Sequence, residues 1–284
     1  MSTAIVRGAH INYEVLGSKG PWMALSPGGR RPLQGVRPLA QRMADAGYRV
    51  VIHDRRNCGA SDVRIGGDDP ENEIWVNDLH ELLQQLGAVP VIVGGGSSGC
   101  RLAILFALRY PGLVKALLLW RITGGRFAAE RLAHQYYTQY IEAAEAGGMA
   151  AVCATEHWQE RIAARAGNRD YLMGMDPKRF IAAMKRWREY FLKGADLPII
   201  GASEADLRSI NVPACVIPGN DRTHDIRTGR NLARLLPNCA LHELYDHDED
   251  ADLVPPEEWQ KRDDEIAAIF MGFLDRALAQ AHHV

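Results

Sequence analysis

A strand that turns sharply into a helix is the feature that most restricts the possible folds of this chain. Residues 91–100 read VIVGGGSSGC, an apolar run that enters a Gly-rich turn just before a helical pattern. Gly95, Ser97 and Gly99 satisfy G-x-S-x-G, a turn so tight that the serine is strained and its neighbours two positions away must be small. The serine hydroxyl then projects above the sheet, and the next N–H, that of Ser98, faces a developing oxyanion at the helix N-terminus. The pattern predicts Ser97 as a nucleophile.

Two other interpretations of this turn stay open. A register one residue later, with Ser98 as the nucleophile, is sterically allowed because Cys100 is small. The glycines can also serve close packing alone, with no chemistry at the turn.

The same turn also matches G-x-G-x-x-G, the dinucleotide-binding pattern, through Gly94, Gly96 and Gly99. That pattern requires an acidic residue about 20 positions further on. Trp120 and Arg121 stand there, and the motif follows several strands instead of opening the domain. An arginine at that place can bind a 2′-phosphate, which keeps dinucleotide binding open as an alternative. It is the least favoured one, because the acidic residue is missing and the motif comes late in the domain.

Short apolar runs alternate with helical patterns on both sides of this turn. Strands are predicted over residues 4–7, 10–16, 22–25, 49–53, 90–93, 114–120, 214–218 and 241–245, and helices over 36–46, 74–86, 98–110, 226–236 and 257–280. The first two strands form a hairpin, and the later alternation predicts a parallel sheet covered on both faces.

The alternation stops between residues 121 and 207. Only helical patterns appear there, over 128–146, 149–166 and 177–194. A chain of 284 residues is near the upper end of what one core supports. We therefore predict one α/β core domain, 1–120 with 208–284, and a helical lid insertion, 121–207.

Four sequence blocks together resemble the α/β-hydrolase family over nearly the whole chain. They are LSPGG (25–29), GYRVVIHDRRNCGASD (47–62), the Gly-rich turn with the helix that ends in LRYP (108–111), and PACVIPGND (213–221) followed by a histidine. The resemblance implies the α/β-hydrolase fold, a mostly parallel central sheet flanked by helices, with a helical lid. It also places the family's nucleophile on Ser97.

The family's chain order is serine, then an acid, then histidine. Asp221 follows the predicted strand 214–218, and His247 follows the predicted strand 241–245. The resemblance thus implies Ser97, Asp221 and His247 as the catalytic residues. The acidic residues around His247 predict a raised pKa for its imidazole. A capping role for Asp221 and a surface position for His247 are the alternatives.

Other residues fit these roles less well at this stage. No residue at the end of the predicted strand 114–120 is acidic. His224 lies only three residues after Asp221, His242 lies inside a predicted strand, and His282 and His283 are in the tail.

The oxyanion hole is expected to pair the Ser98 N–H with that of Gly29 or Arg30. Here the chain departs from the family, which commonly has His-Gly where this chain has Pro27-Gly28. Backbone donors do not depend on the side chain, so the hole survives the change.

The expected substrate site is partly apolar. Ten of the 21 Phe, Trp and Tyr residues lie between Arg121 and Ile200, which favours an apolar pocket roof. Arg30, Arg31 and Arg121 add the hypothesis of an anionic substrate. Expected substrate-binding residues are Arg31, Trp120, Arg121, Tyr137, Trp158 and Trp187.

Composition restricts the partners. Lys and Arg number 33 and Asp and Glu 35, a net charge of −2 that provides no footprint for nucleic acid or an anionic membrane. The five cysteines include no C-x-x-C pair, and no apolar run approaches a membrane span or a secretory signal. We expect a cytoplasmic protein with reduced thiols, no metal and a small-molecule substrate; a homo-oligomer is left open.

These observations predict a cofactor-independent serine hydrolase. It would act on a small to medium, partly apolar ester, lactone or thioester through an acyl-enzyme. Hydrolysis of a C–C bond in a diketone acid and a non-enzymatic ligand receptor are the alternatives on the same fold.

Overall fold

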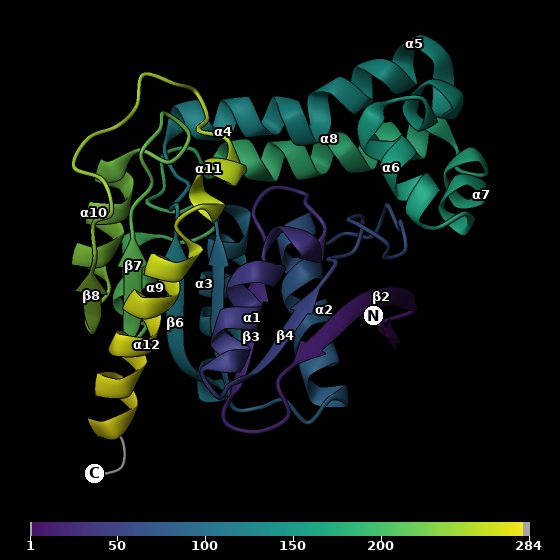
Figure 1. The fold of residues 1–284 in the computed structure, drawn as a ribbon. Helices are drawn as coiled ribbons and strands as arrows, with labels where there is room; N and C mark the ends of the chain where they lie inside the picture. Colours follow the sequence, from purple (N-terminus) through teal and green to yellow (C-terminus); the bar gives the residue numbers. More distant parts are fainter. Residues whose placement is uncertain (1, 281–284) are drawn as a thin grey trace.

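Eight strands form one sheet in the order β1-β2-β4-β3-β5-β6-β7-β8, in a computed structural model that describes residues 2–280 (Figure 1). The strands are β1 (Ser2–Val6), β2 (Ala9–Leu16), β3 (Trp22–Ser26), β4 (Arg49–His53), β5 (Val91–Gly96), β6 (Val114–Trp120), β7 (Ala214–Ile217) and β8 (Cys239–Leu241). β1 and β2 form the predicted hairpin, and β2 pairs with β4 in the antiparallel sense. All other pairs are parallel, as the strand–helix alternation predicts.

Helices connect these strands and cover both faces of the sheet. They are α1 (Arg37–Asp45), α2 (Glu71–Gln85), α3 (Ser98–Arg109), α4 (Arg126–Ala133), α5 (Gln139–Cys153), α6 (Glu156–Ala164), α7 (Gly167–Met173), α8 (Pro177–Lys193), α9 (Glu204–Arg208), α10 (Ile226–Leu235), α11 (Pro256–Gln260) and α12 (Asp263–Gln280). A π-helix, His134–Thr138, joins α4 to α5.

The sheet has an apolar layer on each face because side chains alternate along a strand. On β3, Met23 and Leu25 pack with α1 and α12, whereas Ala24 between them packs with α2, α3 and α10. The inner strands β3 to β7 are almost entirely buried, which explains their continuous apolar runs.

The carboxyl ends of β3, β5, β6 and β7 meet at one edge of the sheet. Helices α4 to α8, inserted between β6 and β7, lie across this edge (Figure 1). Their apolar side chains, among them Trp158, Phe180 and Trp187, form a third cluster, which also includes Val63, Ile65 and Ile74. Open α/β sheets bind ligands at such an edge, so a functional site is expected here.

Three predicted elements differ in the structure. The predicted helix 149–166 is divided between the end of α5 and α6, which begins at Glu156. β8 ends at Leu241 instead of continuing to residue 245, because its partner β7 ends at Ile217 and is followed by Pro218, which has no N–H to donate. The predicted last helix is two helices, α11 and α12. His282 and His283 lie outside the described residues. Within residues 2–280, no helix has the length and apolar character needed to cross a membrane.

Candidate active site

Ser97 stands at the apex of the turn between β5 and α3, where the sequence predicts it. Its backbone has φ 55°, a conformation that is strained for a non-glycine residue. A Cβ on Gly95 would lie 2.3 Å from the carbonyl carbon of Gly99, and a Cβ on Gly99 would lie 2.3 Å from the Ser26 carbonyl oxygen. The requirement for small residues on both sides of Ser97 is therefore physical.

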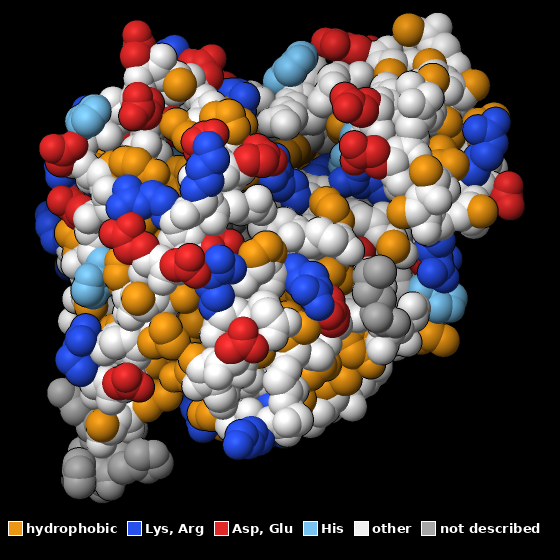
Figure 2. All heavy atoms as spheres, viewed as in Figure 1, with side chains coloured by type: hydrophobic (Ala, Val, Ile, Leu, Met, Phe, Trp, Pro, Cys, Tyr) orange, Lys and Arg blue, Asp and Glu red, His pale blue; other side chains and the backbone are white. Residues whose placement is uncertain are grey.

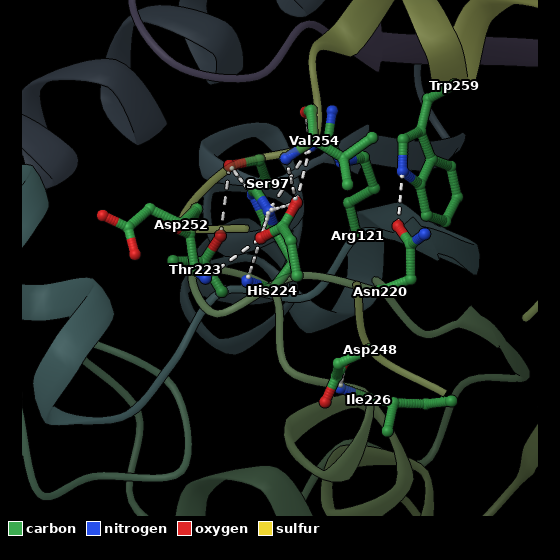
Figure 3. A network of polar contacts seen from close by, with 12 residues as sticks. Ser97, Arg121, Asn220, Thr223, His224, Ile226, Asp248, Asp252, Val254 and Trp259 are labelled. Atoms are coloured by element: carbon green, nitrogen blue, oxygen red, sulfur yellow. Dashed lines mark hydrogen bonds and ion pairs between the residues drawn. The ribbon is translucent and has the colours of Figure 1, made fainter. Parts of the chain in front are cut away.

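The Ser97 hydroxyl meets His224, which the sequence analysis sets aside. His224 Nε2 lies 2.9 Å from Ser97 Oγ, and His224 Nδ1 lies 2.8 Å from Asp221 Oδ1 (Figure 3). The Thr123 hydroxyl is 3.1 Å from Ser97 Oγ. Ser97, His224 and Asp221 thus form a continuous hydrogen-bonded chain, with a ring nitrogen next to the serine and a carboxylate behind the ring.

A tight turn lets an aspartate and a histidine three residues apart meet. The His224 N–H donates to the Asp221 carbonyl oxygen at 3.0 Å, and Asp221 Oδ1 accepts from the N–H groups of Thr223 and His224 at 3.0 and 2.8 Å. Aspartate favours such turns because its side chain can bond the backbone ahead of it. A Cβ on Gly219 would lie 2.2 Å from His224 Cβ, so Gly219 makes room for the ring. Gly219 and the turn-forming Asp221 are the sequence signals for His224.

His247 does not reach this site, and its predicted place beside Ser97 is wrong. Its side chain is 73% exposed, and its Nδ1 lies 2.5 Å from Asp246 Oδ1. Because β8 ends at Leu241, His247 does not sit at a strand end but in a loop whose later part, at Asp252, accepts hydrogen bonds from Thr223. The pKa of His247 is raised by its hydrogen bond with Asp246, in the predicted direction but away from the nucleophile.

Asp221 is held as a carboxylate by the groups around it. Burial raises the pKa of its carboxyl, but hydrogen bonds from His224 and the Val254 N–H and the charge of Arg121 lower that pKa to about 2. Burial lowers the pKa of His224 to about 4; the hydrogen bond to Asp221 opposes this shift, and Arg121 adds to it. The ring is therefore neutral at pH 7, the state in which Nε2 can accept a proton.

Arg121, a predicted substrate contact, forms an ion pair with Asp221. Its Nη2 donates to Asp221 Oδ2 at 3.1 Å and to the Val254 carbonyl oxygen at 2.8 Å (Figure 3). It also lines the cavity beside Ser97, with its guanidinium already engaged by a carboxylate.

The loop after β3 lies against Ser97. A Cβ on Gly28 would be 3.1 Å from Ser97 Cβ. The Gly29 carbonyl oxygen accepts from Ser98 Oγ at 2.7 Å and from Arg55 Nη2 at 2.5 Å, and Arg55 Nη1 donates to Ser98 Oγ at 2.8 Å. These bonds tie the loop to the start of α3. Since a trans peptide is planar, they also direct the Arg30 N–H away from Ser98 Oγ.

A cavity of about 190 Å³ opens beside Ser97 and His224. Its apolar lining comes from α4 and from residues outside the inserted helices. The lining residues include Val36, Leu39, Trp120, Leu132, Leu253, Pro256, Trp259 and Ile266. The predicted contacts Gly29, Arg30, Arg31, Trp120 and Arg121 all line it.

Three predicted aromatic contacts do not line this cavity. Tyr137, Trp158 and Trp187 are 2%, 0% and 1% exposed and pack in the core of the helices between β6 and β7. Tyr136, next to Tyr137, lines the cavity instead. Helical periodicity marks the buried face but not which neighbour covers it, so the sequence does not separate these roles.

A shallower groove adjoins this cavity. Arg30, Arg31 and Tyr136 line both, and Arg161 lines the groove alone. Figure 2 shows a hollow between the helices above the sheet edge and the domain below, with Lys or Arg side chains at its floor. Among the described residues, no cluster of three or more His, Cys, Asp or Glu side chains is arranged to hold a metal ion.

Comparisons with known proteins agree with this architecture. Residues 31–253 match a family model described as the alpha/beta hydrolase fold. A proline iminopeptidase of Neisseria gonorrhoeae is 30% identical over 154 residues, which are 50% of this chain and 46% of the relative, so the match spans less than half of that relative's length.

Solved structures match over nearly the full length. An enol-lactonase from Burkholderia xenovorans LB400 has a TM-score of 0.65 at 19% identity, over 96% of this chain and 100% of the other. A meta-cleavage product hydrolase from Pseudomonas fluorescens IP01 has a TM-score of 0.64 at 16% identity, over 96% and 98%. A thermophilic esterase from Thermogutta terrifontis has a TM-score of 0.64 at 18% identity, over 96% and 98%. Likeness at this level of identity concerns the fold.

Proposed function

The chain belongs to the alpha/beta hydrolase fold family, and on that premise we propose that it hydrolyses small to medium, partly apolar carboxylic esters or lactones through an acyl-enzyme on Ser97. One observation carries the proposal. The Ser97 hydroxyl is 2.9 Å from a neutral, buried imidazole whose other nitrogen is 2.8 Å from a carboxylate. A nucleophile, a base and a group that orients the base are the parts that covalent hydrolysis needs.

Acylation uses these three residues in two steps, the formation and the collapse of a tetrahedral intermediate. Ser97 Oγ attacks the ester carbonyl carbon while its proton moves to His224 Nε2. The tetrahedral intermediate collapses, the C–O bond to the alcohol breaks, and His224 gives its proton to the leaving oxygen. Asp221 stabilises the transient imidazolium and holds the ring in the tautomer with hydrogen on Nδ1.

Deacylation repeats the attack and the collapse with water as the nucleophile. The water oxygen attacks the acyl carbon while His224 Nε2 takes a proton from the water. The bond from that carbon to Ser97 Oγ then breaks, the acid leaves, and Ser97 regains a proton from His224. No electron transfer is involved, so the cycle closes with the protein's own groups.

The negative charge on the carbonyl oxygen needs donors in acylation and in deacylation. We assign the Ser98 N–H, at the N-terminus of α3, and an N–H of the loop Gly28–Arg30. The tie between Gly29, Ser98 and Arg55 supports this role because it holds the loop in a fixed place beside Ser97.

The cavity suggests the substrate scope. A volume of about 190 Å³ with largely apolar walls suits a short acyl or alcohol chain, and each buried methylene contributes about 0.8 kcal/mol to binding. Residues 121–207, whose α4 supplies one wall of the cavity, would act as the lid.

Turnover of an ester series tests the proposal. Wild-type protein should hydrolyse p-nitrophenyl esters of two to eight carbons with an optimum at short to medium length, and Ser97→Ala should lose turnover. A metal chelator or added nicotinamide cofactor should change neither result. No turnover of any ester or lactone, or equal turnover by Ser97→Ala, would refute the proposal.

The relatives favour a second candidate, cleavage after an N-terminal proline. Proline iminopeptidases are 30% identical to this chain, but only over half of it. Proline p-nitroanilide belongs in the same screen, and a kcat/KM for it above that of the best ester would replace the ester proposal. Product analysis on a diketone acid tests C–C bond cleavage in the same way.

A further inference from the structure

Four arginines line the cavity beside Ser97, and three of them are already neutralised. The pairs are Arg30 with Glu71, Arg31 with Glu257 and Arg121 with Asp221, at 2.6, 3.0 and 3.1 Å. The sequence-based hypothesis of an anionic substrate rests on these three residues, and each has a protein carboxylate in the place that a substrate carboxylate would take. They therefore do not supply a free positive charge.

Arg131 is different. It lies on α4 and lines the same cavity as Ser97 and His224. In the described part of the chain, its guanidinium forms no ion pair with a carboxylate, and its Nη1 is buried without a hydrogen-bond partner. A buried donor without an acceptor costs free energy that a ligand acceptor would recover. Arg131 and His224 line the same cavity, and the charge of Arg131 contributes to the lowered pKa of His224.

The lining of the cavity also includes an acid, on a different helix. Asp263, at the start of α12, lines the cavity, is 7% exposed and forms no ion pair among the described residues. Its carboxylate would repel an anion beside it. The lining thus carries a cation without an ion-pair partner on α4 and an acid without one at the start of α12.

From this arrangement we propose that the site takes esters or lactones that carry a second, free carboxylate, which Arg131 binds beneath α4. The inference rests on the proposed ester hydrolase function and narrows its substrate class. An arginine side chain can bind a carboxylate through two parallel N–H groups. Asp263 fixes the orientation, with the uncharged end of the substrate toward α12.

Binding to an inactive variant tests the inference without depending on turnover. In Ser97→Ala, monomethyl adipate and dimethyl adipate are compared by isothermal titration calorimetry. The acid ester should bind about 10- to 100-fold more tightly than the diester, the factor expected for charge-assisted hydrogen bonds. Arg131→Gln should remove this preference, and Arg131→Lys should keep part of it.

Arg126→Gln is the matched control, because Arg126 lies on the same helix but pairs at the surface with Asp196. It should leave the preference unchanged. Equal binding of the two esters, binding of neither, or a preference that survives Arg131→Gln would overturn the inference. Hydrolysis of dimethyl adipate by wild-type protein is scored separately. Its absence, together with failure on all other esters, would refute the hydrolase proposal even where Arg131 binds the acid ester.

Discussion

The pH dependence of ester hydrolysis follows from the burial of His224. His224 must be neutral to accept the serine proton, so kcat/KM rises as pH passes upward through its pKa. Burial and Arg121 lower that pKa to about 4. The acidic limb of the profile should therefore lie well below the ordinary histidine value of about 6.5.

Lowering the pH to 5.5 is the informative perturbation. A histidine with pKa 6.5 would be only about 9% neutral there, whereas one with pKa near 4 would be about 97% neutral. Wild-type protein should thus keep nearly all of its pH 7 value of kcat/KM at pH 5.5. Added salt should move the limb little, because buried charges are screened less than exposed ones.

The assay is kcat/KM for a neutral ester from pH 4 to 8, at two salt concentrations. Circular dichroism at each pH separates loss of activity from loss of fold. A limb near or above pH 6.5 that shifts toward acid with salt would refute the assignment. It would indicate instead an exposed base with carboxylates around it, as in the loop of His247.

Other outcomes follow from the same contacts. Ser98→Ala removes the hydroxyl that links Arg55 to the Gly29 carbonyl. One such hydrogen bond contributes about 1 kcal/mol, so kcat should fall about fivefold with KM little changed. An unchanged kcat would show that these hydrogen bonds do not hold the loop for catalysis. Gly28→Ala places a methyl 3.1 Å from the Cβ of the proposed nucleophile, Ser97. The kcat/KM should fall at least about tenfold while the melting temperature stays the same. Full activity would contradict the close packing of Gly28 against Ser97. The rings of His53 and His224 have folded pKa values of about 3 and about 4, below the ordinary value. Below pH 6.5 the unfolded chain therefore binds more protons than the folded one. The free energy of unfolding should fall by up to about 1.4 kcal/mol per pH unit for each ring, as measured by urea titrations at pH 7, 6 and 5. A free energy of unfolding that rises toward acid pH would contradict the burial of these rings in the neutral form.

Local chemistry made part of the site predictable from sequence. The turn that places Ser97 needs glycines at fixed spacing, and the strand before Asp221 is continuous and apolar. Both are local requirements that leave a direct mark on the chain. The parallel sheet was equally accessible, because its buried strands alternate with amphipathic helices.

The histidine was not accessible in the same way. The family's chain order favours a histidine after the last strand, and the loop around His247 satisfies that order in sequence. The length of β8 depends on where its neighbour β7 ends, which is a tertiary property. The Asp221 turn that carries His224 is local, but a spacing of three residues looks too short until the turn geometry is considered.

The pairing of the charged residues is also a tertiary property. Arg30 and Arg121 lie near the nucleophile as predicted, but their carboxylate partners come from distant positions, Glu71 and Asp221. No pattern along the chain indicates which of the four arginines that line the cavity lacks a carboxylate partner. The unpaired Arg131 becomes visible only when every partner is placed.

Covalent labelling with a serine-directed phosphonate tests the central claim, that His224 activates Ser97, most directly. The modified peptide is identified by mass spectrometry, and the labelling rate is measured for wild type, His224→Gln and His247→Gln. We expect a label on Ser97, a rate lowered about 10²- to 10⁴-fold by His224→Gln, and a wild-type rate for His247→Gln. A label on Ser98, or a rate that falls with His247→Gln and not with His224→Gln, would contradict this claim.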